Sequence, residues 1–264
     1  MKVFSIASGS SGNCVYVETE QIRLLFDAGI SAKRIVCGLQ QNGIEPDTVN
    51  AIFITHEHSD HIAGLSVLLK KYRIPIYGTA ETLQAIMMSS YGKDIAAELL
   101  HSIRPGTVTI LGDAEVSACY TSHDAAKPVC YSVVSGNRKF AMATDLGYYD
   151  DSIVNHLKDA DILYLESNYD RDMLLVGTYP YQLKRRIMGP SGHLSNEDCA
   201  ALIVQLLHNR LQYVILAHLS KENNYPELAF VNANNTLNKN WHYREPCPKL
   251  IVASRDEPID SISI

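Results

Sequence analysis

The chain has 264 residues, of which 46% are hydrophobic and 20% are charged, and its formal net charge is −6 at pH 7. These values are ordinary for a globular protein and argue against fibrous and disordered classes. A chain of this length can bury a large core within one domain, so we expect residues 1–264 to form a single domain. The acidic balance gives no support to binding nucleic acid through a broadly basic surface, so a polyanionic substrate would need a local positive site.

The sequence contains no segment typical of membrane targeting. The first residues, Met1–Ile6, lack the long apolar region of a signal peptide, and no apolar run approaches the roughly 18 residues needed to span a bilayer. Six cysteines occur without a Cys-x-x-Cys pair, which argues against a zinc ribbon or a disulfide framework. We therefore expect a cytoplasmic protein with reduced thiols and no membrane partner, and its oligomeric state is left open.

Short apolar runs separated by turns predict strands and helices distributed along the whole chain. In the first part, strands are expected at 2–7, 14–18, 22–27, 51–54 and 74–77, a turn at 8–13, and helices at 31–43 and 62–72. Further strands are expected within 108–120 and 129–143 and at 162–165, 213–217 and 249–252, with helices near 181–188 and 196–208 and one ending at 232–238. Strand runs at both ends, with helices between them, predict an α/β fold of two packed sheets with helices outside.

The segment Thr55–His61 carries the clearest chemical signal and directly follows a predicted buried strand. It reads Thr-His-Glu-His-Ser-Asp-His, and burying three imidazoles and a carboxylate is costly unless a metal compensates for their lost hydration. Neutral imidazole and carboxylate are good ligands for zinc and related ions. We expect His56 and His58 to reach one ion, and Asp60 and His61 to turn toward a second. A solvated loop with incidental histidines is the alternative, and it fits this spacing less well.

This pattern resembles the metallo-β-lactamase superfamily, and the resemblance extends over most of the chain. It implies a four-layer αββα sandwich and a centre of two divalent metal ions, zinc or manganese, with iron as a third option. The remaining site positions of the superfamily are an aspartate that supports the metal loop, a histidine of the first metal site, a bridging aspartate and a last histidine of the second site. The residues that match these four positions, each at a strand end, are Asp27, His123, Asp145 and His218.

The resemblance also separates this chain from some members of the superfamily. Lactam-hydrolysing members typically lack the histidine that follows Asp60 here, and flavodiiron members carry a glutamate where His58 stands. Asp60, His61 and Asp145 together match the dinuclear pattern of phosphodiesterases, nucleases and thioester hydrolases. Two divalent ions balanced by Asp60, Asp145 and a bridging hydroxide would leave a charge of about +1, which favours a phosphodiester anion.

A second segment, Ser191–Asn196, resembles one found in the tRNA-maturing nucleases of the superfamily. There, a Gly-His-Ser/Thr segment supplies a histidine that donates a proton, and a glutamate from an earlier strand orients it. The resemblance implies that His193 protonates the leaving oxygen and that Glu166 holds its tautomer, so that both join Asp60 as catalytic residues. A merely local structural role for His193 is the alternative.

A basic stretch precedes this segment and contains Lys184, Arg185 and Arg186 beside two tyrosines. Phosphate contact and base stacking both use these residue types, although a run of charges is equally typical of a solvated helix face. Ser220 and Asn223, soon after the last metal-site histidine, are further candidates for binding substrate.

Five segments together resemble one bacterial subfamily, the YycJ/WalJ-like group, regarded as DNA exonucleases that act in the 5′-to-3′ direction. The segments are Ser-Gly-Ser-Ser-Gly-Asn, His-Glu-His-Ser-Asp-His, Glu-Ser-Asn-Tyr-Asp, Gly-His-Leu-Ser-Asn and His-Leu-Ser-Lys-Glu-Asn-Asn. The chain departs from many members at Tyr169, where a histidine is expected, so we assign no role to that position.

The resemblance implies a two-metal phosphodiester hydrolase, a DNA exonuclease that uses a metal-bridging hydroxide as nucleophile on single-stranded DNA or DNA ends. Only 72 residues separate Asp145 from His218, which leaves no room for the β-CASP-type insertion of longer nucleases. The alternative is a small-molecule phosphodiesterase that acts on a cyclic or nucleotide substrate with the same dinuclear centre. The acidic balance and the absent insertion favour this alternative, whereas the run 184–186 favours the nuclease.

Overall fold

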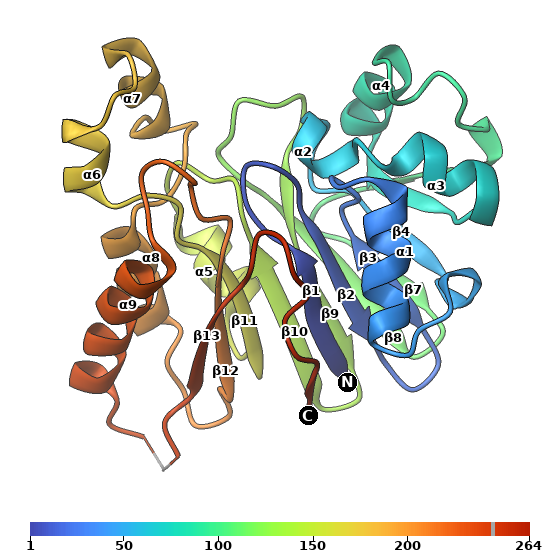
Figure 1. Cartoon of the computed structure of the whole chain (residues 1–264). Coiled ribbons are helices and arrows are strands. Elements are labelled where there is room, and N and C mark those ends of the chain that lie inside the picture. The colour runs from blue at the N-terminus through green and yellow to red at the C-terminus, as the bar shows by residue number, and fades with distance from the viewer. Residues whose placement is uncertain (244–245) are drawn as a thin grey trace.

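Two seven-stranded sheets lie face to face in the computed structural model, which describes residues 1–243 and 246–264 (Figure 1). The first sheet contains, in spatial order, β14 (Ile262–Ser263), β1 (Lys2–Ala7), β2 (Cys14–Glu18), β3 (Arg23–Phe26), β4 (Ala51–Phe53), β5 (Ile76–Thr79) and β6 (Leu100–Ile103). The second contains β13 (Lys249–Val252), β12 (Tyr213–Ala217), β11 (Ile162–Glu166), β10 (Arg138–Ala143), β9 (Val129–Ser135), β8 (Ala114–Tyr120) and β7 (Val108–Leu111).

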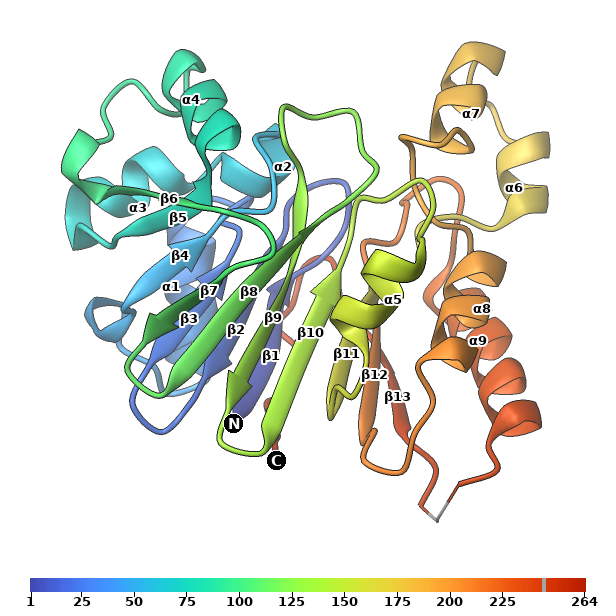
Figure 2. The same cartoon turned by 180° about the vertical axis from the view of Figure 1, so that it is seen from behind.

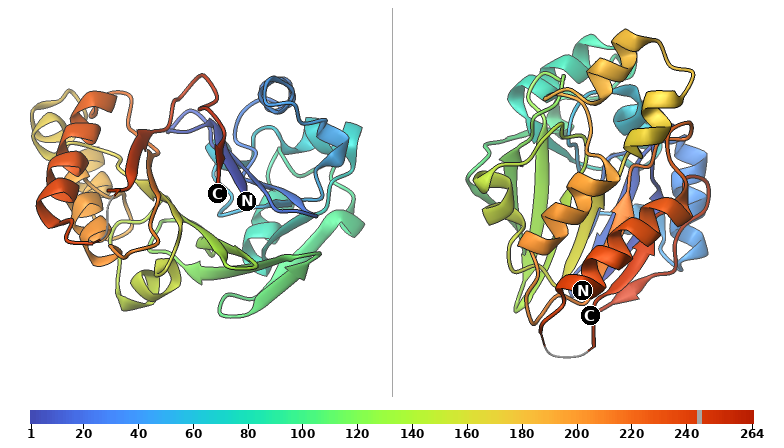
Figure 3. Two further views of the ribbon diagram at one scale, coloured as in Figure 1. Left: turned by 90° about the horizontal axis from the view of Figure 1, so that it is seen from below. Right: turned by 90° about the vertical axis from the view of Figure 1, so that its left-hand side faces the viewer.

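Helices cover the outer face of each sheet (Figures 1 and 2). The first sheet is covered by α1 (Ala32–Gln41), α3 (Leu65–Tyr72) and α4 (Ala80–Met88), and the short α2 (Ser59–Ile62) lies at its edge. The second is covered by α5 (Asp151–Leu157), α8 (Asn196–Gln205) and α9 (Pro226–Asn240), while α6 (Arg171–Val176) and α7 (Tyr181–Ile187) lie beyond one end of it. Single 3₁₀ turns occur at Pro46–Thr48 and Ala97–Leu99. The predicted four-layer αββα sandwich is confirmed, and the view along the strands separates its layers (Figure 3).

Three hydrophobic clusters fill the three spaces between the four layers. In β3, Leu25 packs on the helix side, whereas its neighbours Leu24 and Phe26 pack between the sheets. Because successive side chains of a strand point to opposite faces, a strand covered on both sides needs a continuous apolar run. Phe26 and Phe53 stack between the sheets with ring centroids 5.5 Å apart, and Tyr131 lies 5.4 Å from each.

The direction of the strands brings separate parts of the sequence to one edge of the sandwich. Strands β3 to β6 run parallel to one another, and so do β10 to β13. Carboxyl ends of parallel strands meet at the same edge, where connecting loops can gather functional side chains. Both termini lie at the opposite edge (Figure 1), where the Met1 amino group donates a 2.9 Å hydrogen bond to the carbonyl of Ile264. Among the helices of the described ranges, none is long and apolar enough to cross a membrane.

Most predicted strands are present within one or two residues of their expected positions, and the regions 108–120 and 129–143 each contribute strands as expected. The sequence did not predict α4, α5, α6 or β6. The helix expected at 62–72 is divided into α2 and α3 at Gly64. A β-carbon at Gly64 would lie 2.1 Å from the carbonyl oxygen of Ile30, so the chain passes too close to its neighbour there for any larger residue.

Candidate metal centre

The seven side chains predicted to bind metal meet at the carboxyl edge of the two sheets. They come from the loop after β4 and from α2, and from the loops that follow β8, β10 and β12, and they are His56, His58, Asp60, His61, His123, Asp145 and His218. Their ligand atoms form overlapping groups in which all atoms lie within 4.8 Å of one another: His56, His58 and His123; His56, His61 and Asp145; and Asp60, His61 and His218. The His/Asp clusters are therefore suited to hold divalent metal ions.

The first group consists of three imidazoles. Nε2 of His123 lies 3.3 Å from Nδ1 of His58, and the ring centroids of His56 and His123 are 5.0 Å apart. Nε2 of His56 is buried and has no hydrogen-bond partner among the described residues. Nitrogen lone pairs that converge in this way match the ligand set of one tetrahedral divalent ion with an open position.

The second group combines imidazole and carboxylate, and Asp145 connects it to the first. Oδ2 of Asp60 lies 3.5 Å from Nε2 of both His61 and His218. Asp145 reaches both groups, because its Oδ1 lies 3.5 Å from Nε2 of His218 and 3.8 Å from Nε2 of His123. Within the described ranges, Oδ2 of Asp145 and Nε2 of His218 are buried without a hydrogen-bond partner. An unpartnered buried carboxylate oxygen is costly, and a shared cation would satisfy it.

Asp27 fixes the orientation of His61 from behind the cluster. Its Oδ2 lies 2.7 Å from Nδ1 of His61, while its Oδ1 accepts a 2.8 Å hydrogen bond from the backbone N–H of Thr55. An ionised carboxylate only accepts hydrogen bonds, so Nδ1 of His61 must carry the proton and Nε2 is left facing the cluster.

Two further imidazoles are oriented in the same way. Nδ1 of His218 lies 2.9 Å from Oε1 of Glu166, and Nδ1 of His123 lies 3.1 Å from the carbonyl oxygen of Gly192. Each acceptor requires the proton on Nδ1, so Nε2 of both rings points toward the candidate ions.

Three of these residues adopt left-handed backbone conformations directly after strands. The φ angles of Asp27, Asp145 and His218 are 61°, 57° and 53°. Such conformations cost non-glycine residues on the order of 1–3 kcal/mol each and concentrate at functional sites. Here they turn each side chain sharply off its strand and into the cluster.

The electrostatics of the cluster favour bound cations. Burial opposes ionisation of Asp60, but His61 and His218 outweigh it and hold the pKa of Asp60 well below its usual value. Burial likewise disfavours the imidazolium of His218, but Asp145, Asp60 and Glu166 raise its pKa to about 10. For His56, burial and the neighbouring His61 hold the pKa well below its usual value. The carboxylates thus stay ionised, and His56 stays neutral, as a metal ligand must be.

Glu166 also contacts His193, the predicted proton donor. Oε1 of Glu166 lies 2.7 Å from Nδ1 of His193, and its Oε2 accepts hydrogen bonds from the backbone N–H groups of Leu146 and Leu194 at 3.2 and 3.0 Å. Burial would lower the pKa of His193, but Glu166 and Asp145 outweigh it and raise the pKa. The imidazole is 20% exposed and its ring centroid lies 5.2 Å from that of His123.

The predicted basic stretch lies on α7 and at its carboxyl end, at the same edge of the molecule (Figure 1). Nζ of Lys184 donates to the carbonyls of Leu175 and Gly177 at 2.6 and 2.7 Å, and so closes the end of α6. Arg186 forms a 2.6 Å ion pair with Asp124, and the guanidinium of Arg185 lies 6.0 Å from the ring centroid of Tyr181. Lys184 and Arg186 would therefore have to exchange partners to contact a phosphate, whereas Arg185 remains on an exposed helix face.

The other two predicted substrate-binding residues differ in exposure. Ser220 is partly exposed in the loop after β12, whereas Asn223 is 1% exposed and lies beneath the end of α6. Direct contact between Asn223 and a substrate would require that loop to move.

Two residues that support the cluster were not identified from the sequence. The hydroxyl of Thr55 lies between Asp27 and the imidazoles of His56 and His61, 3.0 Å and 3.2 Å from their Nδ1 atoms. Asn168 donates a 2.8 Å hydrogen bond to the carbonyl of His218 and so holds the turn after β12. Asn168 belongs to the Glu-Ser-Asn-Tyr-Asp segment, so that segment contained a signal; Thr55 offered none beyond its position beside His56.

Comparison with known proteins identifies the family of this arrangement. Residues 22–218 match the family model described as the beta-lactamase superfamily domain. The chain belongs to this superfamily. Within it, the chain is 40% identical to exodeoxyribonuclease WalJ of Streptococcus pneumoniae serotype 2 strain D39 over 232 residues, which are 88% of this chain and 86% of WalJ. It is also 40% identical to exodeoxyribonuclease YycJ of Bacillus anthracis, over 88% of this chain and 87% of YycJ. The resemblance to the YycJ/WalJ-like subfamily is thereby confirmed.

The fold of the superfamily is equally evident among solved structures. Zinc-bound PqqB from Methylobacterium extorquens superposes with a TM-score of 0.73 at 15% identity and covers 98% of this chain and 100% of that chain. At this level of identity the similarity establishes the fold, and it agrees with the two sheets and outer helices described above.

Proposed function

We propose that this member of the β-lactamase superfamily is a metal-dependent exodeoxyribonuclease that degrades single-stranded DNA or DNA ends in the 5′-to-3′ direction. The proposal includes a single catalytic domain over residues 1–264, without a β-CASP-type insertion, that acts in the cytoplasm. The observation that carries it is the position of Asp145 between two groups of ligand atoms, in a chain 40% identical to two exodeoxyribonucleases over 88% of its length. Two metals at such a spacing suit in-line displacement at a phosphodiester.

The ligand set supports two ions with different surroundings. His56, His58 and His123 would hold the first ion, Asp60, His61 and His218 the second, and Asp145 would bridge them. The ions would lower the pKa of a water molecule and stabilise negative charge that develops on the phosphate oxygens. We propose zinc or manganese, because the set mixes imidazole with carboxylate, and iron is compatible with the same ligands.

His193 would move the proton in this scheme. Its Nδ1 is engaged by Glu166, so Nε2 is the atom that can donate to the leaving oxygen of the scissile bond. The raised pKa of His193 favours the protonated form that this role needs. Glu166 would hold the proton on Nδ1 and keep the ring in place.

A small-molecule phosphodiesterase remains the second candidate, because two of the three cations of the predicted DNA-binding run have partners within the protein. Purified protein in Mn²⁺ is incubated with single-stranded DNA labelled at the 3′ end, with the same DNA labelled at the 5′ end, and with bis(p-nitrophenyl) phosphate. A 5′-to-3′ exonuclease releases the 5′ label at once and shortens the 3′-labelled strand progressively. Cleavage of the small diester alone would support the second candidate. An Asp145→Asn variant purified in parallel controls for contaminating nucleases.

A further inference from the structure

A hollow of about 370 Å³ opens beside the candidate metal centre, at the carboxyl ends of β12 and β13. Its wall begins with Leu219 and Ser220, the two residues after His218, and continues through Lys221 and Tyr225 to Arg255. Because β12 and β13 are parallel neighbours, the loop that carries His218 and the loop that carries Arg255 leave the same edge of the sheet side by side.

Arg255 is held against the backbone that supports His218. Its Nη2 donates a 2.7 Å hydrogen bond to the carbonyl of Leu219, and its Nη1 lies 3.3 Å from the hydroxyl of Ser11. The glycine-rich turn leaves room for this arrangement, because a β-carbon at Gly9 would lie 2.9 Å from Nη1 of Arg255. The same turn supports the metal loop, since the hydroxyl of Ser8 accepts a 2.8 Å hydrogen bond from the N–H of His218. The guanidinium is therefore fixed close to the centre.

The hollow is locally positive although the protein is acidic. Of the described residues that line it, the charged ones are Lys221 and Arg255, and none is a carboxylate. Asp256 and Glu257, which follow Arg255, line a different hollow, where Asp256 pairs with Arg34 at 3.8 Å. The local positive site that a polyanionic substrate requires is thus present here, and a guanidinium is well suited to bind phosphate.

An exposed aromatic ring completes the site. Tyr225 precedes α9, is 60% exposed, and its backbone N–H is held by the side chain of Asn224 at 2.9 Å. Asn224 itself is 3% exposed and donates to the carbonyls of Ser167 and Asn168 at 2.9 and 3.1 Å, so the base of the ring is anchored. A flat ring next to cations is the combination that binds single-stranded nucleic acid without sequence preference.

We propose that this hollow is a subsite for the DNA strand, in which Arg255 and Lys221 bind a backbone phosphate and Tyr225 stacks on a base of a nucleotide adjacent to the scissile bond. This inference rests on the proposed nuclease function and places its strand contact away from the basic stretch on α7. Single-stranded DNA fits the site because a base must be unpaired to stack on Tyr225. The subsite adds binding to a strand of several nucleotides and nothing to a substrate too short to reach it.

Steady-state kinetics on the metal-loaded full chain test the inference, with a ten-nucleotide oligothymidylate as substrate and increasing salt. We expect Arg255→Gln/Lys221→Gln to raise KM about tenfold and to lower the slope of log(1/KM) against log salt by about 2, one for each lost phosphate contact. Tyr225→Ala should raise KM by roughly fivefold or more, whereas Tyr225→Phe, which keeps the ring, should restore it.

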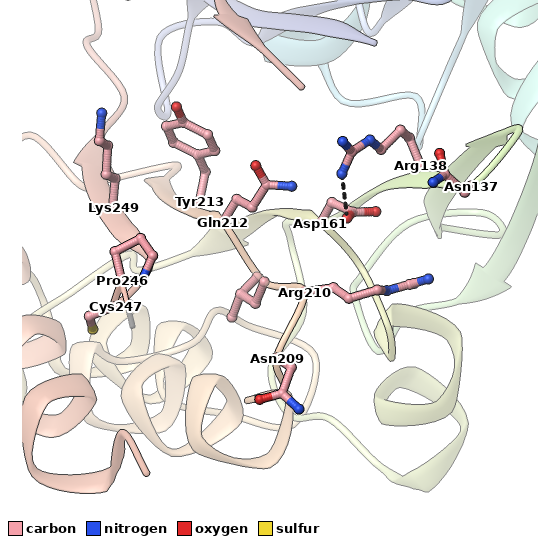
Figure 4. Close-up of a pocket in the computed structure, with 11 residues that line it drawn as sticks. Asn137, Arg138, Asp161, Asn209, Arg210, Gln212, Tyr213, Pro246, Cys247 and Lys249 are labelled. Atoms are coloured by element: carbon pink, nitrogen blue, oxygen red, sulfur yellow. Dashed lines mark hydrogen bonds and ion pairs between the residues drawn. The ribbon is translucent and has the colours of Figure 1, made fainter. Parts of the chain in front are cut away.

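The control is an arginine with matching contacts at the opposite edge of the second sheet. Arg210 lines a hollow of about 470 Å³ at the amino ends of β10 to β13 and donates a 2.8 Å hydrogen bond to the carbonyl of Asp159. Figure 4 shows it near Arg138, which pairs with Asp161. Arg210→Gln removes one cation and one contact to a backbone carbonyl, as Arg255→Gln does, but far from the proposed strand path, so it should leave KM and the salt slope unchanged.

The outcomes separate this inference from the proposed function. If the wild-type protein degrades the oligonucleotide and the double variant and Tyr225→Ala both stay within twofold of Arg210→Gln, the subsite is wrong and the nuclease function stands. If the wild-type protein degrades no oligonucleotide, the proposed function itself is wrong. Should loss of the Leu219 contact unfold the Arg255 variant, Lys221→Gln alone should lower the salt slope by about 1, and with Tyr225→Ala it decides the matter.

Discussion

Oε1 of Glu166 lies 2.7 Å from Nδ1 of His193, and the same oxygen lies 2.9 Å from Nδ1 of His218. One fully buried carboxylate therefore orients both the predicted proton donor and a candidate metal ligand. The two functions are coupled through a single atom, so a change at Glu166 should disturb metal binding and proton transfer together, whereas a change at His193 should affect only the latter.

Replacing His193 by alanine should lower kcat by about 10²- to 10⁴-fold, the usual contribution of a positioned general acid. Metal content should stay at the wild-type level, because His193 is not among the seven candidate ligands. Initial rates on single-stranded DNA, measured beside metal analysis of the same preparation, check both expectations. Loss of metal from His193→Ala would show that the residue serves the cluster instead.

Replacing Asp27 by asparagine should weaken metal binding by roughly 10- to 100-fold, the typical effect of losing the partner that orients a ligating histidine. An amide cannot accept a hydrogen bond through both of its terminal atoms, so either Thr55 or His61 loses its partner. Metal titration followed by calorimetry measures the effect. Asp47→Asn, on an exposed 3₁₀ turn, is the matched control and should bind metal like the wild type.

Adding Zn²⁺ or Mn²⁺ to chelator-treated protein should raise its melting temperature. An ion that binds only the folded state at about 1,000 times its Kd stabilises it by about 4 kcal/mol, which corresponds to roughly 8–16 °C for a protein of this size. Differential scanning calorimetry measures the shift. His56→Ala/His58→Ala should lose much of it, and a wild-type protein whose melting temperature ignores both ions would contradict the metal centre.

Acid should destabilise the protein partly through His156, far from the metal centre. Burial and the nearby Lys139 lower the pKa of His156 to about 4 from an ordinary value of 6.5. The unfolded chain therefore takes up the proton at a higher pH than the folded one, and stability is complete above pH 6.5 and falls as the pH drops toward 4. Urea unfolding at pH 7 and pH 4.5 should show that His156→Gln loses about 2 kcal/mol less than the wild type over this interval. Equal losses in the two proteins would contradict this assignment.

The parts of the fold that the sequence predicted are those in which one physical requirement dominates. Strands buried on both faces need continuous apolar runs, so 213–217 and 249–252 were located to the residue. The missed elements lack that requirement. Strand β6 has no fully buried residue, and α5 buries only Ile153 and Leu157. Their stability comes from neighbours that no local pattern reveals.

The candidate site divides along the same line. The closely spaced residues of 56–61 form an unusual pattern by themselves, whereas the resemblance was needed to select Asp27, His123, Asp145 and His218 from among ordinary polar residues. Neither approach located Arg255, because an isolated arginine near the end of a sequence carries no signal. Its position depends on β13 lying beside β12, which is a property of the assembled sheet.

Gly29 has a consequence for how ions enter the centre. A β-carbon at this position would lie 1.6 Å from the carbonyl oxygen of Asp60, so the backbone after β3 lies directly against the metal loop. Hydrogen bonds from Ala28 to the carbonyl of His61 and from Gly64 to that of Ala28, both 2.8 Å, hold the two segments together. Folding alone thus orders the loop, and arriving ions need contribute little free energy to shape it. A preformed cage of this kind selects ions by size and preferred geometry, and it keeps its form while they exchange.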